Sequence, residues 1–236
     1  MPNPPAYRSP ARPKQAPAGR AYAGLAAEER VAARRARFVE AGIELFGTRG
    51  FRGATVRGVC AAAGLTDRYF YESFESLEAL LVAAYRAQVG ALAQRLAREA
   101  IRSAAWGGDA RDVERQCALG YEIWFAAVRD PRFARIVLVE VLGVSPDVDA
   151  VYERSMREIA ELTIAPLATA LPGLRLSKAR RALLGRALVG AAVQVAKQWM
   201  TEGYRAPRRD VVRTCVLVAT GTLAALRAEA ARPRVR

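Results

Sequence analysis

The stretch from Thr55 to Phe74, TVRGVCAAAGLTDRYFYESF, constrains the fold of this chain more than any other part of it. Four apolar residues in its first half follow the i, i+3, i+4, i+7 spacing of one helical face. They are Val56, Val59, Cys60 and Ala63. Thr55 precedes them as a suitable N-cap, so the pattern predicts a helix of about two turns.

Gly64 interrupts this helix where a sharp turn needs a residue that tolerates positive φ. Thr66 can cap a second short helix, whose inward residues would be Leu65, Phe70 and Phe74. Its outward residues would be Thr66, Asp67, Arg68, Tyr69 and Tyr71. Two short helices joined by a Gly-containing turn form the helix-turn-helix pattern, in which the second helix enters the major groove of DNA.

From about residue 30 to 85 the chain resembles the TetR family of one-component transcriptional regulators. The resemblance is carried by residues at the family's spacing: Phe38, Ala41, Leu45, Phe46, Gly50, Phe51, Thr55, Val56, Val59, the run Ala62 to Thr66, Phe70, Tyr71, Phe74, Ser76, Glu78, Leu80 and Leu81. Two positions depart from the family pattern. Arg68 stands where a small residue is common, and Leu77 stands where a phosphate-contacting Lys is usual.

We expect base contacts from Arg57, Asp67 and Arg68, because Arg offers a bidentate fork to guanine and Asp accepts from cytosine N4. Thr55, Tyr69 and Tyr71 suit phosphate contacts, and Thr66 lies on the same outward side. The resemblance supports Arg57 and Tyr71 best. Asp67 could instead favour the start of its helix by its charge.

Charge agrees with an anionic partner but does not define it. The chain has a formal net charge of +14 and an isoelectric point near 10.6, yet the excess is spread along its whole length. The DNA-binding prediction therefore depends on the motif. Residues 1–27, rich in Pro and basic residues, are expected to form a disordered arm that either contacts DNA or is a passive tail.

Helical periodicity continues throughout the chain and no strand-like alternation interrupts it, so we expect an all-α fold of about nine helices. Its first helix carries Arg34, Arg35 and Arg37, which either lie near the DNA backbone or form a solvated face. The expected domains are a DNA-binding head over 28–92 and a ligand-binding and dimerisation domain over 93–236. A fourth helix, starting near residue 75, should link them.

A few polar groups among aromatic and apolar side chains are typical of a small-molecule pocket between helices, although such residues can also be ordinary core. The expected pocket residues are Tyr121, Trp124, Phe125, Phe133, Glu140, Tyr152, Met156, Gln194 and Trp199. Gln116, Thr163 and Gln198 belong to the same polar pattern.

The last two helices carry small residues that permit close helix packing, and two copies of such a hairpin can form a four-helix interface. The resemblance implies a homodimer through this hairpin, while a buried intrachain hairpin is the alternative. The expected interface residues are Leu188, Ala191, Val195, Val218, Thr222 and Leu226.

These features favour a cytoplasmic, ligand-responsive DNA-binding regulator, most simply a repressor released from a palindromic operator by a hydrophobic or aromatic effector. We expect no cofactor, metal or membrane anchor, and Cys60, Cys117 and Cys215 should be buried free thiols. An enzyme is disfavoured because the chain has no His for a Ser-His-Asp or Cys-His site. A helical protein-interaction or activator protein of the same fold is the remaining alternative.

Overall fold

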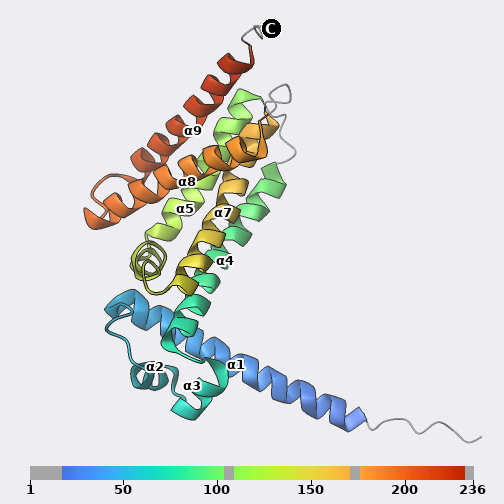
Figure 1. Ribbon diagram of the computed structural model, residues 1–236, viewed down its shortest axis with the longest axis vertical. Helices are drawn as coiled ribbons and strands as arrows, with labels where there is room; N and C mark the ends of the chain where they lie inside the picture. The colour runs from blue at the N-terminus through green and yellow to red at the C-terminus, as the bar shows by residue number, and fades with distance from the viewer. Residues whose placement is uncertain (1–17, 104–108, 171–175, 232–236) are drawn as a thin grey trace, which may run out of the picture.

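The computed structural model describes residues 18–103, 109–170 and 176–231, and over these ranges it is helical and without strands (Figure 1). The expected all-α class is thereby confirmed. Figure 1 shows a small head, formed by α1 to α3, at one end of an elongated bundle of the remaining helices.

The head consists of α1 (Ala18–Arg49), α2 (Val56–Ala63) and α3 (Asp67–Ser73). Its core is aromatic, because the fully buried Phe38 of α1 meets Phe70 edge to face at 5.5 Å between ring centroids. Phe74 closes the same cluster at 6.4 Å from Phe38. The spacing of these rings along the sequence therefore fixes how α3 sits against α1.

Helix α1 begins at Ala18, inside the arm expected over residues 1–27. Residues 18–27, expected to belong to the disordered arm, are thus helical in their backbone. The physical reason is intrinsic propensity, since residues 18–27, AGRAYAGLAA, are rich in Ala and contain no Pro. The rest of the expected arm, residues 1–17, lies outside the described residues.

Helix α4 (Leu77–Ser103) leaves the head and continues without interruption into the bundle. Ser76 caps it, its hydroxyl accepting a hydrogen bond from the Ala79 N–H at 3.1 Å. The boundary expected between residues 92 and 93 falls inside this helix, so one rigid element belongs to both parts of the chain.

The bundle is completed by α5 (Ala110–Val128), α6 (Pro131–Arg135), α7 (Pro146–Thr169), α8 (Lys178–Thr201) and α9 (Arg208–Ala230). Side-chain caps begin three of them, at Asp109, Asp130 and Ser177. The expected thiols Cys60, Cys117 and Cys215 are free and buried. Helix α9 is long and apolar enough to cross a membrane by length and composition, but one such helix is weak evidence, and it packs against α5 as a core helix does.

The segment after Pro131 does not form one continuous α-helix, because a π-helical segment η1 (Ile136–Glu140) follows α6. Single-turn π segments often mark functional positions. Here the segment ends at Glu140, whose Oε2 accepts a hydrogen bond from the Phe51 N–H at 2.7 Å. Arg135 donates to Glu140 Oε1 at 2.8 Å and to the Thr48 carbonyl at 2.7 Å, so η1 and α6 hold the C-terminal end of α1.

Helices α1 and α6 also approach each other closely at Gly47 of α1, which has no side chain to separate them. A Cβ at this position would lie 2.5 Å from the Arg132 Cβ and 2.8 Å from the Arg132 Cα, closer than packed atoms allow. Arg132 in turn donates to Glu44 Oε2 at 2.9 Å. The junction between head and bundle is therefore a close backbone approach surrounded by ion pairs.

The junction predicts the effect of adding one methyl group. Gly47→Ala should force α1 and α6 apart and destabilise the protein by about 1–3 kcal/mol in urea unfolding, as overpacking does. The control is Gly90→Ala in α4, where a Cβ meets nothing within 4 Å. That variant should gain about 0.5–1 kcal/mol from helix propensity. Equal stability of the Gly47→Ala variant and wild type would contradict the close approach.

Candidate DNA-binding surface and ligand cavity

The turn of the helix-turn-helix has the geometry expected from its sequence. Gly64 adopts φ 61° and ψ 38°, the left-handed conformation, and ends α2. At the other end of α2, the Thr55 hydroxyl accepts from the Gly58 N–H at 3.1 Å. Thr66 is the N-cap residue of α3 but makes no side-chain capping bond, whereas Asp67 Oδ1 accepts from the Arg68 N–H.

Arginines of α1 hold the C-terminal ends of the two short helices. Arg37 donates to the Ala63 carbonyl at 2.6 Å at the end of α2, and Arg35 donates to the Ser73 carbonyl at the end of α3. A guanidinium at a helix C-terminus complements the helix dipole. Arg34 lies over the ring of Tyr69, 4.6 Å from its centroid. These contacts give Arg35 and Arg37 a structural role that differs from both expected alternatives, a place near the DNA backbone and a solvated face.

The expected DNA-contacting side chains are all exposed on the head. Phe70 is fully buried beneath them, while Tyr71 is 62% exposed and Tyr69 36% exposed. Arg57 is exposed on α2, and Arg68 pairs with Glu72 at 3.1 Å on the surface of α3. A surface pair of this kind contributes little and can be exchanged for a phosphate or a base edge. These side chains are therefore accessible to solvent and to a binding partner.

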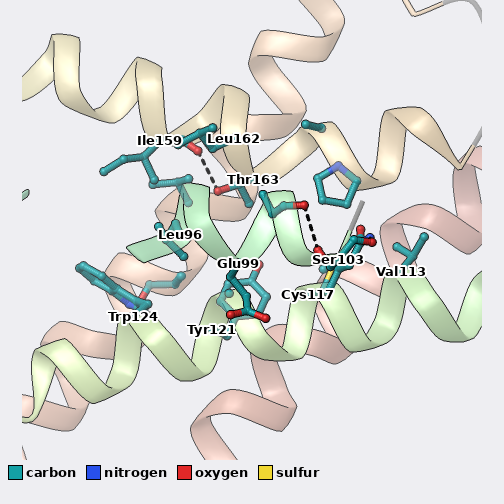
Figure 2. A pocket seen from close by; sticks show the side chains of 18 of the residues that line it. Leu96, Glu99, Ser103, Val113, Cys117, Tyr121, Trp124, Ile159, Leu162 and Thr163 are labelled. Carbon is teal, nitrogen blue, oxygen red and sulfur yellow. Dashed lines mark hydrogen bonds between the residues drawn. The ribbon is translucent and has the colours of Figure 1, made fainter. Parts of the chain in front are cut away.

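A cavity of about 390 Å³ lies in the bundle, lined by residues of α4, α5, α7, α8 and α9 (Figure 2). This volume suits a small ligand. Its lining is mainly apolar: Leu92, Leu96, Glu99, Ala100, Ser103, Val113, Gln116, Cys117, Gly120, Tyr121, Trp124, Met156, Ile159, Leu162, Thr163, Ala165, Pro166, Ala170, Val189, Ala192, Val193 and Ala219. Burial raises the pKa of the Cys117 thiol to about 11 and also raises the pKa of the Tyr121 phenol, so both are neutral near pH 7.

Three of the expected pocket residues line this cavity, namely Tyr121, Trp124 and Met156. The others lie elsewhere. Phe125 and the almost fully buried Trp199 stack edge to face in the core at 5.8 Å, and Phe133 packs against Trp124 outside the lining.

The remaining three expected pocket residues also have other surroundings. Tyr152 stacks on Tyr85 of α4 at 6.3 Å, and Gln194 is exposed on α8. Glu140 belongs to the junction with the head, where it bonds Phe51 and Arg135. Helical spacing identifies an inward face, but it does not say whether that face meets a cavity or a neighbouring helix.

Sequence reasoning missed the contribution of α4 to the cavity. Leu92, Leu96, Glu99 and Ser103 follow the i, i+4, i+7, i+11 spacing of one helical stripe. A carboxylate and a hydroxyl within an otherwise apolar stripe were the signal that could have found it.

The α8–α9 hairpin has an exposed apolar face. Leu183 is 65% exposed, Leu217 70% and Val218 44%, and a Cβ added to Gly190 or Gly221 would meet nothing within 4 Å. Of the expected interface residues, Val218 lies on this face, and Ala191, Val195 and Thr222 are half-buried. Leu188 and Leu226 are buried at 2% and 4% in the chain's own core, because they point toward the bundle.

Comparisons with known proteins agree with this geometry. The family model for bacterial regulatory proteins of the tetR family matches residues 38–84, which span the head and the start of α4. Among proteins of curated function, no match was found.

Solved structures share the fold over most of the chain. The fatty acid degradation regulator FadR from Bacillus halodurans is 14% identical with a TM-score of 0.64, covering 80% of this chain and 95% of its own. FadR from Bacillus subtilis, in complex with stearoyl-CoA, is 12% identical with a TM-score of 0.64, covering 78% and 96%. A TetR-like transcriptional regulator from Rhodococcus sp. RHA1 is 19% identical with a TM-score of 0.59, covering 82% and 97%.

The fold and the helix-turn-helix head define a DNA-binding transcription regulator. The head matches the TetR family over residues 38–84, as the resemblance predicted, and the solved structures share the helical architecture beyond it.

The left-handed turn gives a test of the head alone. Gly64→Val should destabilise the head by about 1–3 kcal/mol, because a β-branched residue is strained at positive φ. Its Cβ would also lie 3.0 Å from Arg37 Nη2. DNA binding, followed by fluorescence anisotropy, should fall while the bundle keeps its helical circular dichroism. Wild-type melting together with wild-type DNA affinity would show that the turn tolerates a side chain.

Proposed function

We propose that this protein is a ligand-responsive transcriptional regulator in the cytoplasm, a repressor released from a palindromic operator by a small hydrophobic or aromatic effector. One observation carries the proposal. Helix α4 begins in the head, where Leu80, Leu81 and Ala84 are buried, and lines the cavity with Leu92 and Leu96 further along. A ligand that moves this helix at the cavity must also move the head.

The proposed switch follows from differential affinity. A ligand shifts an equilibrium between two head positions only by the ratio of its affinities for them. An effector that fits the cavity best when α4 is displaced therefore favours a head spacing that does not match the operator. By linkage, operator DNA should weaken effector binding by the same factor, about 5–150-fold.

The proposed DNA contacts are those on the exposed face of the head. Arg57, Asp67 and Arg68 would read base edges, and Thr55, Thr66, Tyr69 and Tyr71 would position the phosphate backbone. In a dimer the two copies of α3 should lie about 34–36 Å apart, or a multiple of this, to enter successive major grooves.

DNA recognition is tested with operator fragments from the region upstream of the protein's own gene. Footprinting should reveal a two-fold symmetric site. Arg57→Ala should relax base preference at one position in each half-site, costing about 1–3 kcal/mol, whereas Tyr71→Phe should weaken all sequences alike. Arg111→Ala, which removes the same charge from exposed α5, is the control. Protection of one asymmetric half-site would argue against the dimeric arrangement.

The proposed homodimer uses the exposed face of the α8–α9 hairpin. Leu183 and Leu217 are large apolar side chains exposed to solvent. Gly190 and Gly221, in the same two helices, are small enough to permit two hairpins to approach closely. The same hairpin of a second copy would cover this face.

A charge placed in that face tests the dimer. Leu217→Glu should shift the protein to a monomer in sedimentation velocity and weaken operator binding, because it buries an unpaired carboxylate. Ile101→Glu is the control, since Ile101 is 75% exposed and belongs to α4, outside the hairpin. A Leu217→Glu protein that stays dimeric would place the interface elsewhere.

Filling the cavity tests the effector. Gly120 lies in α5 at the cavity wall, and a Cβ there meets nothing within 4 Å. Gly120→Leu should occupy the ligand space while keeping operator affinity. Titration with 1-decanol and 2-naphthol should release operator from wild type and from the control Gly90→Leu, but not from Gly120→Leu. If all three proteins respond alike, the cavity is not the effector site.

The alternative of a helical protein-interaction or activator protein predicts other results. It would bind its target without any response to compounds that enter the cavity. The family model that matches the head describes bacterial regulatory proteins, which supports a regulator rather than an enzyme.

A further inference from the structure

The cavity wall offers fewer free hydrogen-bond donors than acceptors, and this difference restricts which ligands the cavity can bind. Most side-chain donors in its wall are already used by helix carbonyls. Ser103 donates to the Ala100 carbonyl and Thr163 to the Ile159 carbonyl. Trp124 Nε1 donates to the Ala192 carbonyl at 3.4 Å, and Gln116 Nε2 to the Ser103 carbonyl at 3.1 Å. Figure 2 shows several of these groups around the cavity.

The acceptors, by contrast, keep capacity for a ligand. A hydroxyl that donates one bond still offers lone pairs, as Ser103 and Thr163 do, and the amide oxygen of Gln116 is an acceptor. The spare donors are neutral groups: the phenol of Tyr121, one N–H of Gln116 and the weak S–H of Cys117. A ligand entering this space meets mainly acceptors.

Glu99 adds a formal negative charge to the same wall. It is the ionisable carboxylate among the described lining residues, and none of those residues is Arg or Lys. Its side chain is 20% exposed, while its partner Arg102, three residues along α4, is 74% exposed. Arg102 therefore covers Glu99 from the solvent side and can move back into water at little cost.

Carbonyl groups of the lining helices add to the negative potential at the cavity. The last turn of α4, from Ala100 to Ser103, lies at the cavity, so its carbonyl groups present the negative end of a helix dipole. In α7, Pro166 has no N–H to donate to the Leu162 carbonyl, and both residues line the cavity. The positive end of α5 is offset by Asp109, whose carboxylate accepts from the Asp112 N–H at 2.8 Å.

From this arrangement we propose that the effector is an amphipathic cation, an alkyl or aryl ammonium compound whose nitrogen replaces Arg102 at Glu99 while its apolar part fills the cavity. The inference rests on the proposed function, because it names the class of ligand for the same cavity. An anionic head group would lose its hydration and meet only neutral donors beside a carboxylate. A neutral alcohol can bind, but gains no charge pair.

The FadR proteins share the fold at 12–14% identity, and the Bacillus subtilis one is in complex with stearoyl-CoA. That ligand carries an anionic head group. The wall described here has no described Arg or Lys to meet such a group. Within one fold, the side chains facing the cavity set the ligand class.

The test uses three probes of equal chain length, decylammonium, 1-decanol and decanoate, titrated calorimetrically into the full-length protein below their micelle concentrations. Decylammonium should bind about tenfold more tightly than 1-decanol, and decanoate should bind most weakly, since only the cation pairs with a partly buried carboxylate. Decanoate binding as tightly as decylammonium would overturn the inference.

Variants separate the charge pair from general packing. Glu99→Gln should reduce decylammonium affinity about tenfold while leaving 1-decanol within about threefold of wild type. Arg102→Ala should raise decylammonium affinity, because it removes the competing cation. Glu122→Gln, which removes a carboxylate paired with Arg208 outside the cavity lining, is the control and should change no affinity. Equal weakening of all three probes by Glu99→Gln, or no change with any of them, would refute the role of Glu99.

Operator release, measured with the same probes, separates this inference from the proposed function. If 1-decanol and decylammonium release operator equally well and bind equally well, the ligand class is wrong and the ligand-responsive function stands. If decylammonium binds with the expected preference and leaves operator affinity unchanged, the ligand class stands and the switch is wrong. If no probe binds, or if binding persists in Gly120→Leu, both are wrong.

Discussion

The continuity of helix α4 is the constraint on which the rest of the structure depends. Its residues from Leu77 to Ser103 span about 40 Å at 1.5 Å per residue, from the head to the far end of the cavity. Buried Leu80, Leu81 and Ala84 fix it to the head, and Leu92 and Leu96 line the cavity further along. Because a helix transmits displacement along its axis, the two parts of the chain are coupled by covalent structure as well as by packing.

A second connection joins the head to the bundle and restricts how α4 can move. Glu140, at the end of the π-helical segment, holds the Phe51 N–H and Arg135, while Gly47 lets α1 approach α6 closely. The head is attached to the bundle both by α4 and by this junction. It can tilt only if the close approach at Gly47 acts as a pivot or if the polar contacts of Glu140 and Arg135 exchange. Ion pairs in partial contact with water exchange more readily than packed backbone separates. The junction therefore suits rotation of the head about Gly47.

The sequence specified the head closely, and it located the cavity only in part. Thr55, Gly64 and the buried Phe70 could be assigned because a cap, a positive-φ turn and a helical apolar face are local properties of the chain. Tyr121 and Trp124, two of the residues expected to bind a ligand, line the cavity. Phe125 and Trp199 have the same spacing and chemistry, yet they fill the core, since the difference lies in which helix stands opposite them. The polar stripe of α4 at Glu99 and Ser103 went unrecognised for the same reason.

What the sequence by itself determined is the all-α class, the helix-turn-helix and most helix ends, because these follow from interactions between residues a few positions apart. Only the tertiary structure decided which side chains far apart in the chain contact each other. It placed Glu140 within hydrogen-bond distance of the Phe51 N–H, 89 positions away in the chain, and it let Arg37 donate to the Ala63 carbonyl. It also turned Leu188 and Leu226 into the core and left Leu217 in solvent. Helix periodicity fixes which residues share a face, but the packing of whole helices decides what that face meets.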